Sequence, residues 1–84
     1  MLTINYMAKL REELDCSTEQ IEWQGGTVDE LLSFLRQRGE PWQSTLSAAN
    51  VYKVAVNSEI IHDNKASYLD SNAVVALLPP VTGG

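Results

Sequence analysis

The most constraining feature of this chain of 84 residues is an apolar run that stops abruptly at two prolines. Residues 73–78 read Ala-Val-Val-Ala-Leu-Leu and predict a buried strand. Pro79 and Pro80 cannot donate a ladder hydrogen bond, so they end the strand and keep the following chain extended. Because the run is apolar at every position and tightly bounded, we expect a central strand that is paired on both sides.

After the prolines the sequence closes with Val81, Thr82, Gly83 and Gly84. Six extended residues span at most about 20 Å, which is enough to enter a narrow slot on another protein. The two glycines carry no side chain that could clash with such a slot or shield a terminal carboxylate. We therefore interpret residues 1–78 as the folded domain and residues 79–84 as an extended tail whose reactive group is the carboxylate of Gly84. The alternative is a flexible terminus that happens to be glycine.

The composition indicates which kinds of partner the chain can bind and in which cellular compartment it folds. A net charge of −5 weighs against nucleic acid or an anionic membrane surface, since both require a basic face. One cysteine cannot form an internal disulfide, as is usual for cytosolic domains. No apolar run approaches the length of a membrane span, and no basic-then-apolar leader opens the chain. We therefore expect a single cytoplasmic domain.

One main helix is predicted after Gly25-Gly26. Thr27 followed by Glu30 matches a capping box, and Gly39 is the expected left-handed stop. Between these signals the apolar residues fall on one helical face, namely Val28, Leu31, Leu32 and Leu35. Two cations in the last turn suit the helix dipole, namely Arg36 and Arg38.

Alternating apolar and polar residues predict strands at four further places: residues 2–6, 18–23, 52–57 and 60–61. The first two could pair antiparallel, with a short helix over residues 8–14 between them. Trp42 and Leu46 could anchor a short irregular helix, Ser58-Glu59 reads as a turn, and residues 66–72 read as a polar connection. The pattern predicts an α+β fold, a mixed sheet packed against one main helix, whose last strand could run parallel to the first.

Strand alternation also predicts an exposed apolar patch. If Val75 and Leu77 point toward the helix, Leu78 points away from it. Ile60 and Met7 could join Leu78 beside the tail and form a docking surface. The alternative is that these residues cap a minor core beneath the Trp42 segment.

Few side chains in the sequence are candidates for catalysis or metal binding. Cys16 could relay sulfur, but the neighbouring Asp15 would raise rather than lower the pKa of its thiol. His62 and Asp63 are adjacent in sequence and so rarely face each other. One histidine and one cysteine are too few soft ligands for a zinc site, so we expect no metal.

These residues resemble the ubiquitin-like β-grasp family, and within it the small, sulfur-carrying subunits of molybdopterin synthase. The strongest match is the terminal run Val-Ala-Leu-Leu-Pro-Pro-Val-Thr-Gly-Gly over residues 75–84. Weaker matches are Ala-Lys-Leu-Arg-Glu at residues 8–12, Thr27-Val28, Val-Ala-Val-Asn at residues 54–57 and Leu69-Asp70.

The resemblance implies a function for the tail. An E1-like adenylating enzyme would use ATP to activate the Gly84 carboxylate, and a sulfur donor would convert it to a thiocarboxylate. The tail from Pro79 to Gly84 would then enter the large subunit of a heterotetramer. There the sulfur would pass to cyclic pyranopterin monophosphate to form molybdopterin. On this view the chain binds no cofactor, and the catalytic side chains belong to the large subunit.

Two other functions share this fold and ending. One is a sulfur carrier for thiamine synthesis or tRNA thiolation. The other is a ubiquitin-like modifier that forms isopeptide bonds through Gly84. The Pro-Pro-Val-Thr-Gly-Gly context favours molybdopterin synthase.

Overall fold

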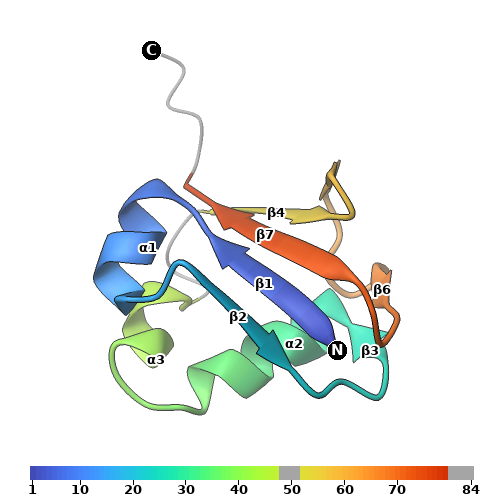
Figure 1. The fold of residues 1–84 in the computed structure, drawn as a ribbon, viewed down its shortest axis with the longest axis horizontal. Helices are drawn as coiled ribbons and strands as arrows, with labels where there is room; N and C mark the ends of the chain where they lie inside the picture. Colours follow the sequence, from blue (N-terminus) through green and yellow to red (C-terminus); the bar gives the residue numbers. More distant parts are fainter. Residues whose placement is uncertain (48–51, 80–84) are drawn as a thin grey trace.

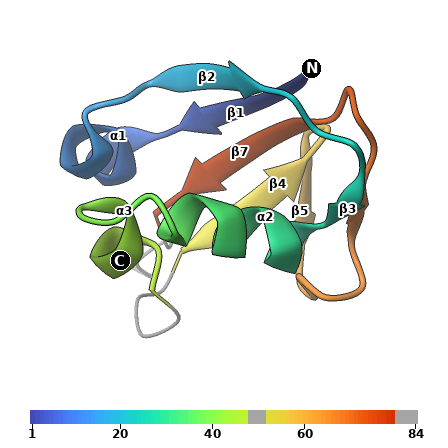
Figure 2. The ribbon, with the colours of Figure 1, turned by 90° about the horizontal axis from the view of Figure 1, so that it is seen from below.

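The computed structural model describes residues 1–47 and 52–79. Five strands form a mixed sheet in the order β2-β1-β7-β4-β5, and two strands, β3 and β6, form a small second sheet. Helices α2 and α3 lie behind the main sheet in Figure 1, and Figure 2 shows them on one side of the sheet, below β2, β1 and β7. The elements are β1 (Leu2–Tyr6), α1 (Ala8–Leu14), β2 (Thr18–Ile21), β3 (Gly26–Thr27), α2 (Val28–Arg36), α3 (Trp42–Thr45), β4 (Lys53–Val56), β5 (Glu59–Ile61), β6 (Tyr68–Leu69) and β7 (Val74–Leu78).

Strand β7 occupies the centre of the sheet, as the apolar run predicts. It pairs with β1 in parallel, from Thr3 opposite Val74 to Tyr6 opposite Leu77, and with β4 antiparallel. Val75 and Leu77 point toward the helices and are 0% exposed. The α+β fold with a mixed sheet is therefore confirmed, including the parallel first and last strands.

Helix α2 begins and packs as its sequence predicts. The amide of Glu30 donates to Thr27 Oγ1 over 3.2 Å, and the amide of Thr27 donates to Glu30 Oε1 over 2.9 Å, which completes the capping box. The helix ends at Arg36, and Gly39 follows with a φ of +90°. The four residues of its predicted apolar face are fully buried and join the core with the inward side chains of β1, β4 and β7, whereas Phe34 is 46% exposed.

The second sheet was not predicted. Gly26–Thr27 pairs antiparallel with Tyr68–Leu69, and Leu69 is 0% exposed, so residues 66–72 are more than a polar connection. The indole Nε1 of Trp23 donates to the Leu69 carbonyl over 3.3 Å. That bond lies outside β2, which ends at Ile21 rather than at Trp23. Strands of two residues are too short to show an alternating pattern.

The turn between β4 and β5 lies one residue earlier than predicted, at Asn57-Ser58 rather than Ser58-Glu59. Asn57 has a φ of 50° and Ser58 a φ of 74°, the left-handed pair of a type I′ hairpin turn. Asn57 also binds β7: its amide donates to the Val74 carbonyl over 2.8 Å, and its Oδ1 accepts from the Val74 amide over 3.0 Å. Asparagine therefore suits the first position of this turn.

We predict that Ser58→Gly stabilises the fold. Position 58 is exposed and left-handed, where glycine avoids a steric cost of about 1 kcal/mol. The urea midpoint should therefore rise. The control is Ser33→Gly on the exposed face of α2, where the same substitution should cost about 0.5 kcal/mol through lost helix propensity. A lower midpoint for Ser58→Gly would contradict the turn assignment.

Candidate docking surface at the root of the tail

The face of the sheet away from α2 carries a strip of apolar side chains. Residues paired across neighbouring strands lie on the same face. Ala76 of β7 is opposite Ala55 of β4, and Ala55 is opposite Ile60 of β5. We call the following set the outer strip: Met7, Ala55, Ile60, Val74, Ala76 and Leu78. Ile60 is 47% exposed and Val74 43%.

Met7 lies at the end of the outer strip that is nearest the tail. Its amide donates to the Leu77 carbonyl over 3.1 Å, which continues the β1–β7 register and sets Met7 beside Leu78. Met7 is 44% exposed and Leu78 is partly buried. The structure thus brings Met7, Leu78 and Ile60 onto one face, while Trp42 packs edge-on against Tyr6 on the other. Their role in docking remains a prediction.

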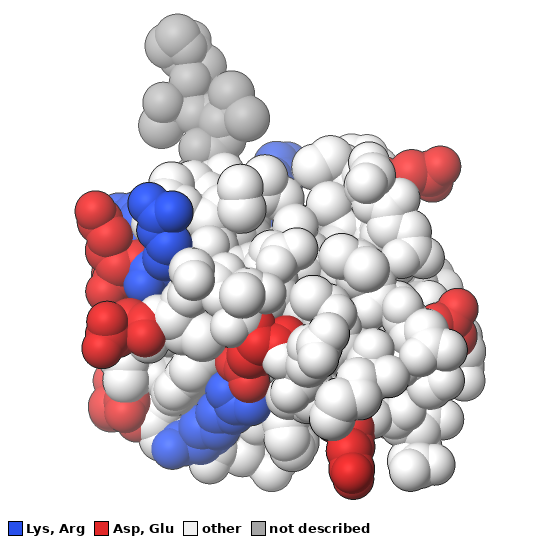
Figure 3. All heavy atoms as spheres, in the orientation of Figure 1, with Lys and Arg blue, Asp and Glu red and all other residues white. Residues whose placement is uncertain are grey.

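The outer face is polar over β1 and β2 and mainly apolar over β7, β4 and β5, where the exposed Lys53 is paired with Leu78. Over β1 and β2, Thr18 Oγ1 donates to Asn5 Oδ1 over 2.8 Å, and Gln20 Nε2 donates to Thr3 Oγ1 over 3.4 Å. In Figure 3, charged side chains stand mainly around the margin of this face and leave the area over β7 largely uncharged. Sequence analysis identified Leu78 but missed Val74 and Ala76, although the same alternation along β7 places all three on one side.

The tail itself lies mostly beyond the described residues. Pro79 is described and partly buried, and with Leu78 it forms what we call the tail root. The predictions for Pro80, Val81, Thr82, Gly83 and Gly84, and the division into residues 1–78 and 79–84, therefore stay predictions.

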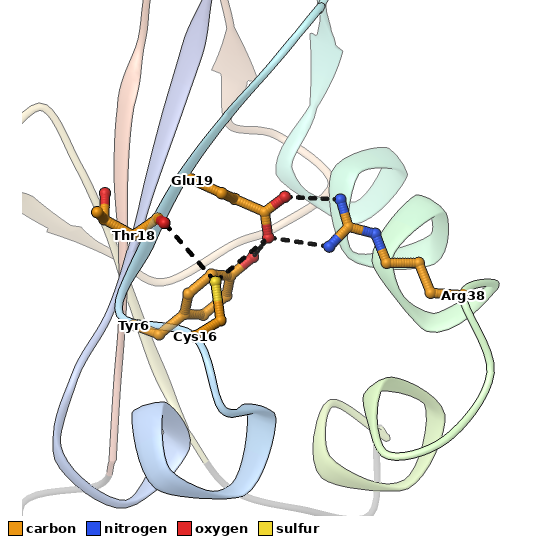
Figure 4. A network of polar contacts seen from close by, with 5 residues as sticks. All are labelled: Tyr6, Cys16, Thr18, Glu19 and Arg38. Atoms are coloured by element: carbon orange, nitrogen blue, oxygen red, sulfur yellow. Dashed lines mark hydrogen bonds and ion pairs between the residues drawn. The ribbon is translucent and has the colours of Figure 1, made fainter.

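Cys16 lies beside a carboxylate rather than in a basic site. Its Sγ is 4.0 Å from Glu19 Oε2 (Figure 4). Burial first, and then the Glu19 carboxylate, raise the pKa of this thiol, while Asp15 contributes least. The pKa of Cys16 is raised, as the sequence argument predicts, but the main causes are burial and Glu19 rather than Asp15. A thiol with a raised pKa is a poor nucleophile at neutral pH, which argues against a sulfur relay at Cys16.

The other candidates do not converge on a site. Asp63 Oδ1 accepts from the amides of Lys65 and Ala66, and so turns into its own loop. Within residues 1–47 and 52–79, no three side chains among His, Cys, Asp and Glu lie close enough together to hold a metal ion. No helix in the described part of the chain could cross a membrane.

Comparison with known families gives a match over residues 4–84, to the ThiS family. The chain belongs to the ThiS family. The match includes β7, the tail root and the Gly-Gly end. No curated protein matches the chain.

Solved structures support the same fold. The chain is similar to a putative molybdopterin converting factor subunit 1 from Pyrococcus furiosus, with 23% identity, a TM-score of 0.75, and coverage of 95% of this chain and 97% of that one. It is similar to a chain in the complex of molybdopterin-converting factor subunits 1 and 2 from Helicobacter pylori, with 26% identity, a TM-score of 0.67, and coverage of 99% and 97%. It also resembles small archaeal modifier protein 1 from Methanosarcina acetivorans, with 17% identity, a TM-score of 0.74, and coverage of 99% and 95%.

We predict that Glu19, more than Asp15, suppresses thiolate formation at Cys16. The rate of alkylation by iodoacetamide, measured against pH, reports the fraction of thiolate. The midpoint of that profile should move to lower pH in Glu19→Gln, because a negative charge beside the thiol is removed. Asp15→Asn is the matched control and should move it less. A larger shift in Asp15→Asn would refute this order.

Proposed function

We propose that this chain is the sulfur-carrying small subunit of a molybdopterin synthase and that Gly84 carries the sulfur as a thiocarboxylate. One observation carries the proposal: the central strand β7 exposes apolar side chains along the outer strip and leads directly into the Pro-Pro-Val-Thr-Gly-Gly tail. A partner that covers the strip would receive the tail at a fixed place.

The comparisons support a sulfur carrier and favour this pathway. The ThiS family match reaches Gly84, and the 26% identical neighbour is a subunit of a molybdopterin-converting complex. By analogy with that complex, the docking partner of this chain would be a large subunit. An adenylating enzyme and a sulfur donor would act before it, and the cycle would run in the cytoplasm.

The proposed chemistry needs only the terminal carboxylate from this chain. A carboxylate oxygen of Gly84 attacks the α-phosphorus of ATP, and pyrophosphate leaves. A sulfur nucleophile then attacks the acyl adenylate, and AMP leaves with the bonding electrons of the acyl–oxygen bond. With a persulfide as the sulfur nucleophile the product is an acyl disulfide, and a thiol cleaves its S–S bond, so that the thiocarboxylate leaves and a disulfide remains on the donor. In the large subunit the thiocarboxylate sulfur attacks cyclic pyranopterin monophosphate, and water then hydrolyses the resulting thioester, which leaves the sulfur on the pterin and restores the Gly84 carboxylate. An intact-mass measurement on chain purified from a pathway-competent host tests thiocarboxylate formation as the exchange of one oxygen for sulfur.

A protein modifier is the second candidate, since the chain also has the fold of small archaeal modifier protein 1. A modifier would appear as isopeptide conjugates of Gly84 with lysines of other proteins. A sulfur carrier for thiamine synthesis or tRNA thiolation would instead give the same thiocarboxylate without binding a molybdopterin synthase large subunit. Copurification of the partner separates these outcomes.

We predict that Leu78→Lys weakens docking on the large subunit by at least tenfold. An ammonium group in an apolar interface would lose its water without gaining a partner, at a cost of about 2 kcal/mol or more. Calorimetry measures the affinity. The control is Thr18→Lys, which adds a lysine to the polar part of the same face and should leave binding within about threefold. Unchanged binding of Leu78→Lys, with a lowered melting temperature instead, would show that Leu78 acts in the core.

We predict that Gly83→Val blocks adenylation or sulfur delivery while thermal unfolding is unchanged. The new side chain would have to pass a slot shaped for bare backbone, yet the carboxylate of Gly84 would be retained. Assays of adenylate formation and sulfur transfer measure the two steps separately. Deletion of Gly84 should abolish both while the domain stays folded. Wild-type rates for Gly83→Val would mean that glycine is not required for clearance.

A further inference from the structure

Four side chains from four parts of the fold contact one another in a closed ring. Glu19 Oε2 accepts from the Tyr6 hydroxyl over 2.7 Å and from Arg38 Nη1 over 2.9 Å, and Glu19 Oε1 accepts from Arg38 Nη2 over 2.7 Å (Figure 4). The Arg38 guanidinium lies 4.6 Å from the centroid of the Trp42 ring. The Trp42 and Tyr6 rings are 5.4 Å apart at 70°. We call these residues the Glu19 ring.

The Glu19 ring lies on the helix side of the sheet, at the end of β1 that pairs with the tail-root end of β7. Tyr6 is the last residue of β1 and is paired with Leu77. The next residue, Met7, makes the last hydrogen bond between β1 and β7 and belongs to the outer strip. One peptide bond therefore separates the Glu19 ring from the candidate docking surface.

After Met7 the backbone turns into α1, and the Met7 carbonyl accepts from the Leu10 amide over 3.1 Å. Ala8 has a φ of 51°, a left-handed conformation that is sterically disfavoured for alanine. The chain thus leaves β1 through a strained residue.

Tyr6, the residue before Met7, is held by its amide, which donates to the Ser17 carbonyl over 2.9 Å, and by its hydroxyl, which donates to Glu19. The Tyr6 side chain is 1% exposed, and its hydroxyl finds its acceptor in Glu19. Both Glu19 oxygens act as acceptors in this ring, and a glutamine would offer only one. Glu19→Gln would therefore set an amide NH2 group against a donor of Tyr6 or Arg38 and loosen the end of β1.

We propose that Glu19 is a positioning residue for docking: through Tyr6 it fixes Met7 beside Leu78, so that the outer strip and the tail root form one rigid surface. The inference rests on the proposed function, because it assigns the outer strip to a large subunit. Arg38 orients the Glu19 carboxylate with two hydrogen bonds, and these hold the pKa of Glu19 below its usual value.

Amide hydrogen exchange tests this inference without a partner protein. The Met7 amide, which donates to Leu77, reports the tail-root end of β7. The Asn57 amide, which donates to Val74, reports the opposite end. In Glu19→Gln at neutral pH, exchange at Met7 should rise about tenfold relative to exchange at Asn57. Tyr6→Phe keeps the ring that packs on Trp42, loses only the hydroxyl, and should give the same selective rise.

Glu13→Gln is the matched control, because it removes the same charge from an exposed pair with Lys9 on α1. It should leave the ratio of the two exchange rates unchanged. Equal changes at Met7 and Asn57 in Glu19→Gln and Tyr6→Phe, or no change at all, would overturn the inference. If Glu19→Gln fails to fold, Tyr6→Phe decides.

A binding measurement completes the test. Glu19→Gln and Tyr6→Phe should weaken affinity for the large subunit about tenfold, and selective exchange at Met7 with unchanged affinity would overturn the docking role. Failure of the proposed function would give a different result. The wild-type chain would then not bind the large subunit, but Glu19→Gln and Tyr6→Phe would still raise exchange at Met7 selectively.

Discussion

The burial of β7 between β1 and β4 is the constraint on which the rest of the structure depends. Its inward side chains, Val75 and Leu77, are fully buried under α2, and each is worth roughly 1.5–3 kcal/mol of unfolding free energy. A parallel partner on one side requires a crossover, and the chain between β1 and β7 supplies it with α2, α3 and the β4–β5 hairpin. The order of the elements therefore follows from placing the last strand in the middle.

The C-terminal end of α2 then secures both neighbours of β7. Arg38 reaches β1 through Glu19 and Tyr6. Arg36 reaches the chain before β4: its Nε donates to the Leu46 carbonyl over 2.6 Å, and its Nη2 lies 3.2 Å from the Tyr52 hydroxyl. Exposed ion pairs add little to stability, but partly buried arginines with several hydrogen bonds fix geometry. Both anchors lie behind the end of the sheet from which the tail leaves.

Much of this architecture could be predicted from local patterns. Three patterns each predict their element from a few neighbouring residues. They are the capping box of Thr27 and Glu30, the apolar stripe of α2 and the apolar run from residue 73 to 78. What could not be predicted depends on contacts between distant residues. The pairing of β3 with β6 joins residues about 40 positions apart in two-residue strands. The contact of Arg38 with Glu19 has no local signal. Helix-dipole reasoning placed Arg38 in the last turn of α2, but the helix ends at Arg36, and Arg38 pairs with Glu19 instead.

The sequence predicts which face of the sheet carries the candidate docking surface. The structure shows which residues belong to that surface. Leu78, Ile60 and Met7 followed from alternation. Val74 and Ala76 follow from the same alternation once Leu78 is assigned to the outer face, and the register of β7 shows which residues of β1 and β4 lie beside them. The Glu19 ring required the tertiary fold, since its members come from four separate segments.

Alternation along β7 lets the strand fill the core with one set of side chains and offer another set to a partner. Val75 and Leu77 serve the core, and Val74, Ala76 and Leu78 face outward, so a partner can bind the strand without disturbing the packing beneath it. A rigid strand that ends at two prolines also keeps the root of the tail in one place relative to the outer strip. On the proposed function, binding of the strip would present a short tail at a high local concentration, and the entropy of locating the reacting terminus would be lost once, in docking. If this proposal holds, a carrier that supplies no catalytic side chain would still contribute to the rate, because it would deliver its end group to the partner's site in a fixed position.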